Sequence, residues 1–236
     1  MINAKKCGAL HMSNNNPINE YEIDSQPIAN VKFYKDVGIT VDARMSLKAH
    51  ILILRKKTFF LCKSLHASFS PRNYRFLAIL FKVYVLPILT YGLPFFFPRT
   101  IESVSNLDNV QRKLTKIFLR RTFPTADYNT RLAILDLQPI ELTFLKYSLI
   151  YLFKMVRFSH PLKHLLPKPS FASVRNATIK FQTPALKSNF RKFLFPVNLI
   201  YVWNSLPPSL LSSPSVSRFR QGLEHVDLSR FLKGHT

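Results

Sequence analysis

Two pairs of cysteine and histidine have the residue types and matched spacing that metal chemistry would need. Cys7 precedes His11, and Cys62 precedes His66, each with three residues between them. Thiolate and imidazole are ligands that zinc prefers, so the four side chains could form a tetrahedral site. The two halves lie much farther apart in the sequence than those of a zinc finger. We therefore interpret the cysteines as buried structural residues and the histidines as exposed.

Clusters of basic residues are the second feature that could carry chemistry, because they could contact phosphates. Arg55, Lys56 and Lys57 are consecutive, and a second cluster follows one face of the segment 112–121. A third cluster lies between two phenylalanines at 190–193, a mixture of charge and aromatic rings that is typical of single-strand binding. Any one cluster alone is typical of a solvated helix face, but three clusters with few acids favour a surface that attracts an anionic partner. The candidate nucleic-acid-binding residues are Arg55, Lys56, Lys57, Arg112, Lys113, Lys116, Arg120, Arg121, Arg191 and Lys192.

Catalytic motifs built from acids or glycines do not occur in the sequence. Nucleotidyl transfer needs carboxylates gathered around two divalent ions, and no two aspartates are adjacent here. Asp24, Asp36 and Asp42 fall in predicted turns or at strand ends, where aspartate is common for structural reasons. The 5 glycines are too scattered for a phosphate-binding loop, and there is no Gly-x-Ser-x-Gly motif. We assign no catalytic residue and no metal ligand.

The overall charge indicates a polyanionic partner. The chain has 34 Lys+Arg and 12 Asp+Glu, a net charge of +22. Residues 43–101 and 142–223 contain no acid, and their basic residues alternate with apolar ones at helical spacing. This pattern predicts a folded basic surface rather than a disordered basic tail. Nucleic acid is the commonest partner of such a surface, and an anionic membrane is the next.

The sequence does not predict export or a membrane span. The first residues are polar, unlike a signal peptide, and the two cysteines are compatible with a reducing compartment. The longest apolar stretch, Tyr84–Pro98, is interrupted by Pro87, Gly92 and Pro94 and is shorter than the roughly 20 residues that span a bilayer. We expect this stretch to be a buried connection. The protein is expected to be intracellular, cytoplasmic or nuclear, and not secreted.

The segments that contain the basic clusters are predicted to be mainly helical. Residues 21–33 favour a hairpin, followed by a third candidate strand at Val37–Val41. Apolar residues at three- and four-residue steps predict a helix over Ser46–His66 and another after Ser70–Pro71, with Ser70 as N-cap. Thr100 is the expected N-cap of a third helix. Three helices of similar length favour a small bundle.

The remainder of the chain is predicted to contain further helices and short strands. A short helix is expected over Asn129–Leu135, and a longer one begins at Pro139 with Glu141 in its first turn, where an acid suits the helix dipole. The other expectations are a linker over 161–169, short strands within 173–183, a helix over 198–206 and a last helix capped by Ser215.

Five segments carry, in order, motifs that occur together in one protein family. They are Asn3-x-Lys5-Lys6-Cys7, Val31-x-x-Tyr34-Lys35-Asp36-Val37-Gly38-Ile39, Tyr84-Val85-Leu86-Pro87-Ile88-Leu89-Thr90-Tyr91-Gly92, Val110-Gln111-Arg112-Lys113-Leu114-Thr115-Lys116 and Trp203-Asn204-x-Leu206-Pro207. On these segments the chain resembles the region after the catalytic motif in reverse transcriptases of non-LTR (LINE-type) retrotransposons, particularly the Jockey and CR1-like groups. Phe95-Phe96-Phe97-Pro98 departs from the family, which usually has a tryptophan before the proline.

The resemblance implies a mainly α fold in three parts. These are the end of the palm with its primer-side β-hairpin (1–42), a three-helix thumb bundle (43–125) and a helical C-terminal domain with short strands (126–236). In the intact enzyme the thumb grips the template–primer duplex, and the C-terminal part helps to hold the element RNA. The resemblance therefore adds Lys35, in the primer-side hairpin, to the candidate binding residues. The implied partners are RNA and an RNA–DNA or DNA primer–template duplex.

The resemblance also implies which function is missing. The Phe/Tyr-Ala-Asp-Asp motif, which holds magnesium in the intact enzyme, would precede Met1, so we expect no cofactor and no polymerase activity in this chain alone. The expected function is that of a fragment of an RNA-directed DNA polymerase that retains nucleic-acid-binding surfaces. Two alternatives stay open: a non-functional orphan fragment with exposed hydrophobic strands, and a basic amphipathic protein on an anionic membrane surface.

Overall fold

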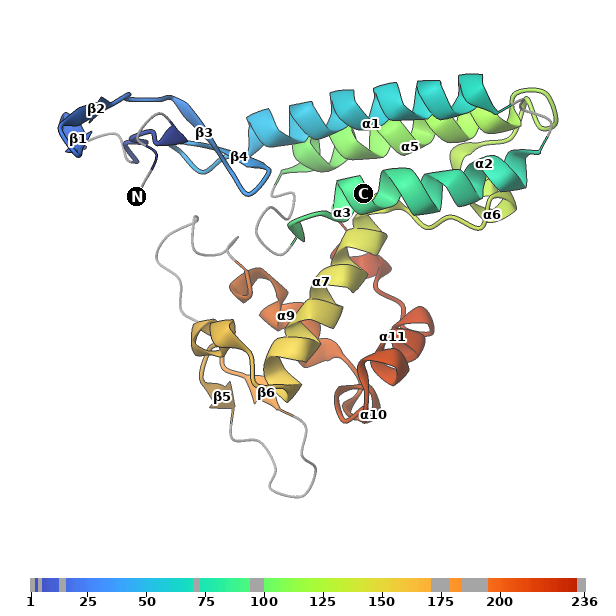
Figure 1. The fold of residues 1–236 in the computed structure, drawn as a ribbon. Helices are drawn as coiled ribbons and strands as arrows, with labels where there is room; N and C mark the ends of the chain where they lie inside the picture. The colour runs from blue at the N-terminus through green and yellow to red at the C-terminus, as the bar shows by residue number, and fades with distance from the viewer. Residues whose placement is uncertain are drawn as a thin grey trace.

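The computed structural model describes residues 3, 6–12, 16–69, 73–93, 100–170, 179–183 and 195–232. These residues are mainly helical, as predicted, and they form two hydrophobic cores. Figure 1 shows two β-hairpins at one end of a layer of long helices, with a second group of helices packed below that layer. The long helices carry most of the candidate binding residues.

Two antiparallel hairpins precede the helices. Val37 and Gly38 form the tight turn of the second hairpin, and both have the positive φ (44° and 83°) that a two-residue hairpin turn requires. The prediction of a strand beginning at Val37 is therefore wrong, because the strand begins only after this turn. The four strands are β1 (Tyr21–Ile23), β2 (Gln26–Ile28), β3 (Phe33–Asp36) and β4 (Ile39–Asp42).

Three helical segments form the bundle that the apolar periodicity predicted. The first and third run in the same direction, and the middle segment runs back between their ends (Figure 1). Their facing sides bury Ile51, Val85, Leu89, Leu107 and Leu114 in one core. The segments are α1 (Lys48–Ser68), the continuous run of α2 (Tyr74–Leu80), a π-helix (Phe81–Val85) and α3 (Leu86–Thr90), and α5 (Ile101–Leu119).

The predicted N-cap is correct for α5 and wrong for α2. Thr100 caps α5 as expected, because its side chain accepts a hydrogen bond from the Ser103 backbone N–H. Helix α2 begins at Tyr74, and the Asn73 side chain accepts hydrogen bonds from the backbone N–H groups of Arg75 and Phe76. The prediction of Ser70 as its N-cap is therefore wrong, and Ser70–Pro71 lie outside the described residues.

The stretch predicted as a buried connection is helical in its first half. Pro87 lies in the first turn of α3, where the missing N–H of proline is tolerated. Val85 and Leu89 are buried, but Tyr84 is 53% exposed, so only one side of this stretch is buried. Pro94–Pro98 lie outside the described residues.

A single helix, α7 (Ile140–Arg157), links the two cores. Ile140 and Phe144 in its first turns belong to the bundle core, whereas Leu145, Leu149 and Phe153 farther along belong to the second core. Glu141 lies in the first turn as predicted. Helix α6 (Tyr128–Ile134) precedes α7 and is capped by Asp127, whose side chain accepts from the Thr130 N–H. The predicted domain boundaries stay predictions.

The second core is built around Trp203. Its indole N–H donates to the Ile179 carbonyl at 2.8 Å, and its ring lies beside the stacked rings of Phe153 and Phe219. Ser215 caps the last helix, as predicted, by accepting from the Arg218 N–H. The elements here are a 3-10 helix (Pro161–Leu165), β5 (Pro169–Ser170), β6 (Lys180–Phe181), a 3-10 helix (Val197–Leu199), α9 (Ile200–Ser205), α10 (Pro208–Leu211), α11 (Val216–Glu224) and a 3-10 helix (Ser229–Phe231).

Candidate nucleic-acid interface

Helices α1 and α5 lie side by side, and polar contacts fix their register. Lys48 Nζ lies 3.1 Å from Glu102 Oε2 near the start of both helices. About two turns farther along α1, Arg55 Nη1 donates to Asn106 Oδ1 of α5 at 2.8 Å. This alignment brings basic residues that are distant in the sequence onto one surface.

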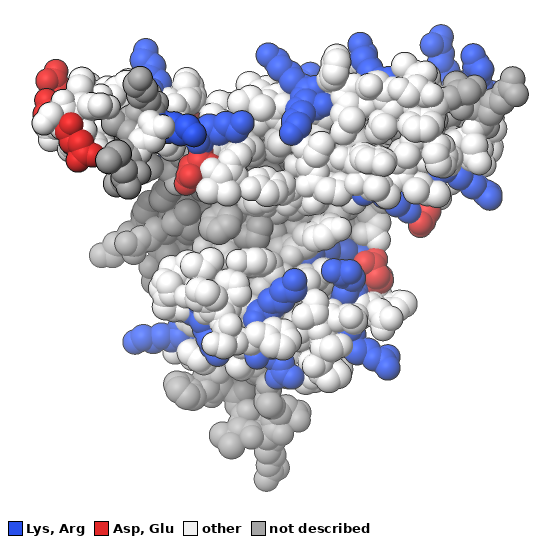
Figure 2. Space-filling view, viewed as in Figure 1, with Lys and Arg blue, Asp and Glu red and all other residues white. Residues whose placement is uncertain are grey.

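The exposed surface of α1 is basic along its length. The helix contains no Asp or Glu, and Lys56, Lys57 and Lys63 are all exposed. Figure 2 shows Lys and Arg side chains along the edge of the bundle, whereas acidic side chains gather on the hairpin at the opposite end. The acids nearest this surface, Glu102 and Asp108, pair with Lys48 and Arg112, so the positive charges of the remaining α1 lysines repel one another unless an anion is present.

A groove of about 300 Å³ lies between the two helices, and we call it the α1/α5 groove. It is lined by both basic and apolar side chains. Phe59 is one of them, and the centroid of its ring lies 5.1 Å from Lys63 Nζ and 5.5 Å from Lys113 Nζ. Both ammonium groups are close enough for cation–π attraction. The residues that line the groove are Leu52, Arg55, Lys56, Phe59, Asn109, Val110 and Lys113.

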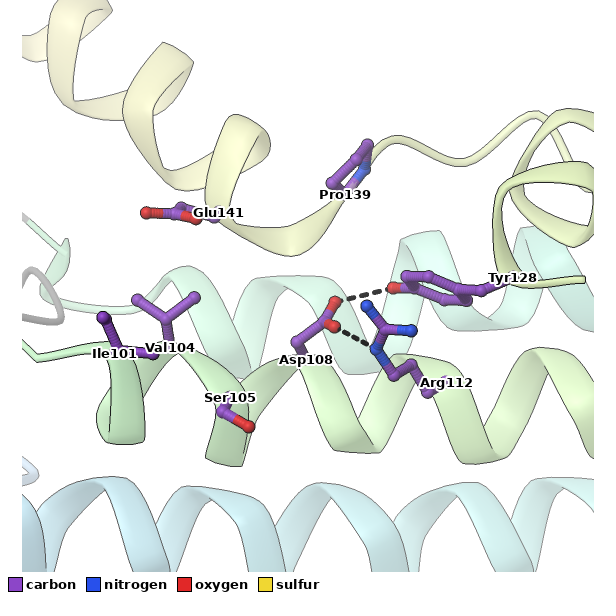
Figure 3. Close-up of a pocket in the computed structure, with 8 residues that line it drawn as sticks. All are labelled: Ile101, Val104, Ser105, Asp108, Arg112, Tyr128, Pro139 and Glu141. Atoms are coloured by element: carbon purple, nitrogen blue, oxygen red, sulfur yellow. Dashed lines mark hydrogen bonds and ion pairs between the residues drawn. The ribbon is translucent and has the colours of Figure 1, made fainter. Parts of the chain in front are cut away.

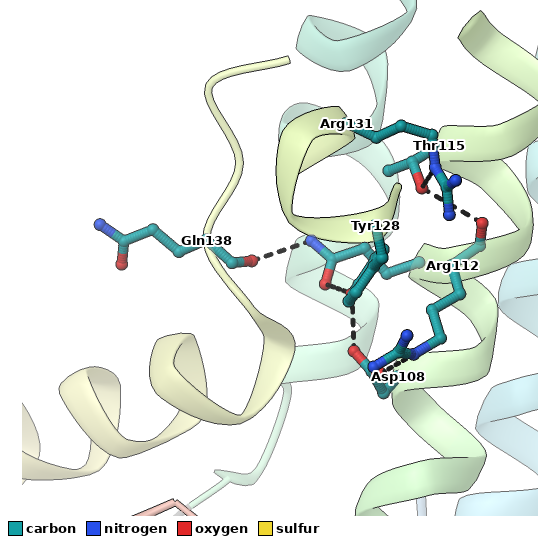
Figure 4. Close-up of polar contacts among 7 residues, drawn as sticks. Asp108, Arg112, Thr115, Tyr128, Arg131 and Gln138 are labelled. Atoms are coloured by element: carbon teal, nitrogen blue, oxygen red, sulfur yellow. Dashed lines mark hydrogen bonds and ion pairs between the residues drawn. The ribbon is translucent and has the colours of Figure 1, made fainter. Parts of the chain in front are cut away.

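Arg112 contacts neighbouring side chains of its own chain. Its Nε lies 2.5 Å from Asp108 Oδ2, and its guanidinium group lies 4.0 Å from the centre of the Tyr128 ring (Figure 4). The Tyr128 hydroxyl donates to Asp108 Oδ1 at 2.7 Å and lies 3.0 Å from Gln111 Oε1. The carboxylate of Asp108 thus compensates the charge of Arg112, whereas no ion pair among the described residues engages its neighbour Lys113.

Asp108, Arg112 and Tyr128 also line a cavity of about 250 Å³ between α5 and the start of α7 (Figure 3). Ile101 and Val104 lie on its α5 side, so its wall is partly apolar. Burial, and then the hydrogen bond and charge of Asp108, raise the pKa of Tyr128. The phenol is therefore neutral at physiological pH and acts as a hydrogen-bond donor that positions α6 against α5.

The structure brings together only part of the predicted binding set. Arg55, Lys56 and Lys113 surround the α1/α5 groove, and Lys57 lies on the exposed side of α1. Lys116, Arg120 and Arg121 are exposed at the far end of α5. Arg191 and Lys192 lie outside the described residues.

Lys35 lies apart from the groove, exposed on β3. Its hairpin is joined to the bundle by the Tyr91 hydroxyl, which donates to the Val37 carbonyl at 2.8 Å. A further contact comes from the Thr40 backbone N–H, which donates to His50 Nδ1 at 3.3 Å. The hairpin is thus attached to the end of the bundle where α1 begins, while the groove lies farther along α1.

Two residues of the groove surface were missed by sequence reasoning. Phe59 and Lys63 are four positions apart on α1, so their side chains are neighbours on one face of the helix. That spacing was available in the sequence. The contribution of Lys113 to the same ring was not, because it depends on how α1 packs against α5.

The interpretation of the cysteines as buried and the histidines as exposed is correct only for Cys62, because Cys7, His11 and His66 are all partly buried. Cys62 is buried, and this burial raises the pKa of its thiol to about 12. Cys7 is partly buried, and its thiol donates weakly to the Asn3 carbonyl. Across the described ranges, no three His, Cys, Asp or Glu side chains gather in a way that could hold a metal ion.

None of the helices in the described part of the chain is long and apolar enough to cross a membrane. Comparisons of this chain with protein-family models, curated proteins and solved structures found no match. The functional conclusion therefore depends on the geometry of the basic surface and on the sequence motifs.

Proposed function

We propose that this chain is the end of the palm, the thumb and the C-terminal domain of a non-LTR retrotransposon reverse transcriptase, and that it binds RNA or a primer–template duplex through the surface of α1 and α5. The observation that supports binding is the row of uncompensated cations along α1, with Lys113 of α5 beside it. Among the basic residues of α1 and α5, the ion pairs of the described residues engage Lys48 and Arg112, but not Lys56, Lys57, Lys63 or Lys113.

The dimensions of α1 agree with a nucleic-acid backbone. A helix of 21 residues is about 30 Å long. One turn of a duplex repeats over roughly 34 Å. Lysines one to two helical turns apart along α1 could therefore follow successive phosphates. Each phosphate that they neutralise releases condensed counterions, which makes such binding strongly dependent on salt.

The proposal assigns no nucleotidyl transfer to these residues. Transfer requires carboxylates that hold two metal ions, and the acids near this surface are engaged elsewhere: Glu102 pairs with Lys48, and Asp108 pairs with Arg112. The proposed activity is binding that positions RNA or a duplex.

The first test is a titration of the purified chain against a labelled RNA–DNA primer–template, followed by fluorescence anisotropy at several salt concentrations. We expect log affinity to fall linearly with log salt. The double variant Lys56→Glu, Lys113→Glu should bind more weakly, and its salt slope should be smaller by roughly 2, because two phosphate contacts are lost.

The matched control reverses two exposed lysines of the other core, Lys163→Glu and Lys168→Glu. It changes the net charge equally and leaves the α1/α5 groove unchanged. Equal loss of affinity in both double variants would show that net charge alone drives binding. Binding by the unaltered chain without any salt slope would contradict the proposal.

A further inference from the structure

Phosphate binding explains the lysines of α1 but not its aromatic residues. Phe60 is 76% exposed, although it lies on the most basic helix of the bundle. On the helix surface its neighbours are Lys56 and Lys57, about one turn before it, and Lys63, one turn after it. Phe59, the residue that precedes Phe60 in the sequence, lines the α1/α5 groove. Rings and cations therefore alternate along this surface.

The groove itself has a size that suits one flat ring. Its volume of about 300 Å³ is at the lower end of the range of about 300–1,000 Å³ for ligand pockets. Leu52, Phe59 and Val110 give it apolar surface, while Arg55, Lys56 and Lys113 bring positive charge to its lining. A hydrated phosphate gains nothing from the apolar surface. An aromatic group that carries a phosphate can contact the apolar surface with its ring and the basic side chains with its phosphate.

Unpaired nucleotides are such groups. In a duplex the faces of the bases are stacked on one another and only the backbone and groove edges face a protein. In a single strand each base has a free π-face, and stacking on a protein aromatic ring stabilises the complex for any base. The combination of an exposed phenylalanine and flanking lysines is therefore better suited to single strands than to a duplex.

We infer that the surface around Phe59 and Phe60 is a single-strand site: an unpaired base stacks on Phe60, a neighbouring base enters the α1/α5 groove, and lysines hold the intervening phosphates. The lysines are Lys56, Lys57, Lys63 and Lys113. This inference rests on the proposed function and specifies its substrate, a single-stranded segment of RNA or DNA rather than the paired region of a primer–template.

The test uses Phe60→Leu in the full chain. Phe60 is mostly exposed, so leucine preserves the fold while removing the π-face. The probes are a labelled oligouridylate, the same strand with abasic positions, and an RNA–DNA duplex. The matched control is Phe76→Leu, a phenylalanine that is 42% exposed on α2, away from the groove.

We expect Phe60→Leu to weaken oligouridylate binding by roughly 5-fold or more, as loss of one stacked base predicts. Its salt slope and its affinity for the duplex should stay unchanged, and Phe60→Trp should restore single-strand binding. The abasic strand should bind the unaltered chain and the leucine variant equally. The control variant should bind all probes as the unaltered chain does.

The inference is overturned if Phe60→Leu binds oligouridylate as tightly as the unaltered chain, or if it loses duplex and single-strand affinity equally. In either case salt-dependent binding by the unaltered chain would leave the proposed function standing. Failure of the unaltered chain to bind any of the probes with a salt slope would overturn both.

Discussion

At the scale of single residues, neighbouring side chains decide which basic residue is available to a ligand. Arg112 and Lys113 are adjacent on α5, yet Arg112 pairs with Asp108 and lies over Tyr128, whereas Lys113 faces the groove. Tyr128 comes from α6 and its hydroxyl donates to Asp108, so the position of this carboxylate depends on another helix. Asp108 is mostly shielded from solvent, which strengthens its contacts.

We predict that Tyr128→Phe destabilises the fold by about 1.5–3 kcal/mol, the usual contribution of a hydrogen bond to a charged group. The Asp108 carboxylate would lose its hydroxyl donor while remaining largely buried. Urea unfolding followed by circular dichroism measures the difference. Tyr147→Phe, at a more exposed position on α7, should stay within about 0.5 kcal/mol of the unaltered chain. Equal stability of the two variants would refute the role assigned to Tyr128.

The two thiols should differ in reactivity. Burial raises the pKa of Cys62 to about 12, and the thiolate is the reactive form, so Cys62 should not react with a disulfide reagent in the folded chain. Cys7, which is only partly buried, should react. Counting modified thiols by mass spectrometry before and after unfolding checks this. Rapid modification of Cys62 in the folded state would show that α1 opens at this position.

At the scale of elements, one carboxylate joins the bundle to the helices of the second core. Glu224, at the end of α11, accepts hydrogen bonds from Lys146 Nζ of α7 at 2.6 Å and from Gln138 Nε2 at 2.8 Å. The Gln138 carbonyl in turn accepts from Gln111 Nε2 of α5 at 2.9 Å (Figure 4). Three helices and the loop before α7 are thereby held by consecutive hydrogen bonds.

The packing of α11 on α7 should weaken in acid. Burial raises the pKa of Glu224. Hydrogen bonds from Lys146 and Gln138 and nearby positive charge lower this pKa by more than burial raises it, so the net pKa lies below the ordinary value of 4.5. The ionised form therefore stabilises the folded state above about pH 4.5, and this stability is lost as the pH falls through the folded-state pKa. Unfolding free energies measured between neutral and acidic pH should show this loss.

Glu224→Gln should reduce that pH dependence and lower stability at neutral pH. Glu102→Gln, which alters the exposed pair with Lys48, provides the comparison and should have a smaller effect. An identical pH profile for Glu224→Gln and the unaltered chain would mean that the hydrogen bonds to Glu224 do not stabilise the fold.

At the scale of the whole molecule, the net charge of +22 opposes folding through self-repulsion. A polyanion that binds the folded state relieves this repulsion. Because it binds the folded and not the unfolded chain, it raises the free energy of unfolding by about 2.7 kcal/mol at a ligand concentration 100 times Kd. We predict that heparin raises the Tm at low salt, and that sodium chloride of equal ionic strength raises it less. Equal shifts would mean that screening alone, without a binding surface, accounts for the effect.

The sequence was sufficient to predict the long helices and several of their ends. Apolar residues at helical spacing indicated α1 and α5. Thr100 and Ser215 were recognised as N-caps because capping is local: each side chain accepts a hydrogen bond from a backbone N–H three residues later. The turn at Val37 and Gly38 was missed because the strand-forming valine there adopts a left-handed conformation that its type disfavours.

The composition of the candidate site could be predicted only in part, because packing between helices determines it. Arg55 and Lys56 are recognisable as basic residues on α1, but the groove exists only where α5 lies against them. Likewise, the sequence presents Arg112 and Lys113 as equivalent, and the contact with Tyr128 that distinguishes them involves a separate helix. Local spacing cannot predict contacts of this kind.

The position of Trp203 has an optical consequence. It is the only tryptophan of the chain, it is 1% exposed, and it belongs to the core formed by α7, α9 and α11. Its emission therefore reports on that half of the molecule, while the bundle that carries the α1/α5 groove contributes no tryptophan signal. Unfolding curves from tryptophan emission and from far-ultraviolet circular dichroism coincide only if both cores melt together. Their separation would measure how independently the basic bundle folds.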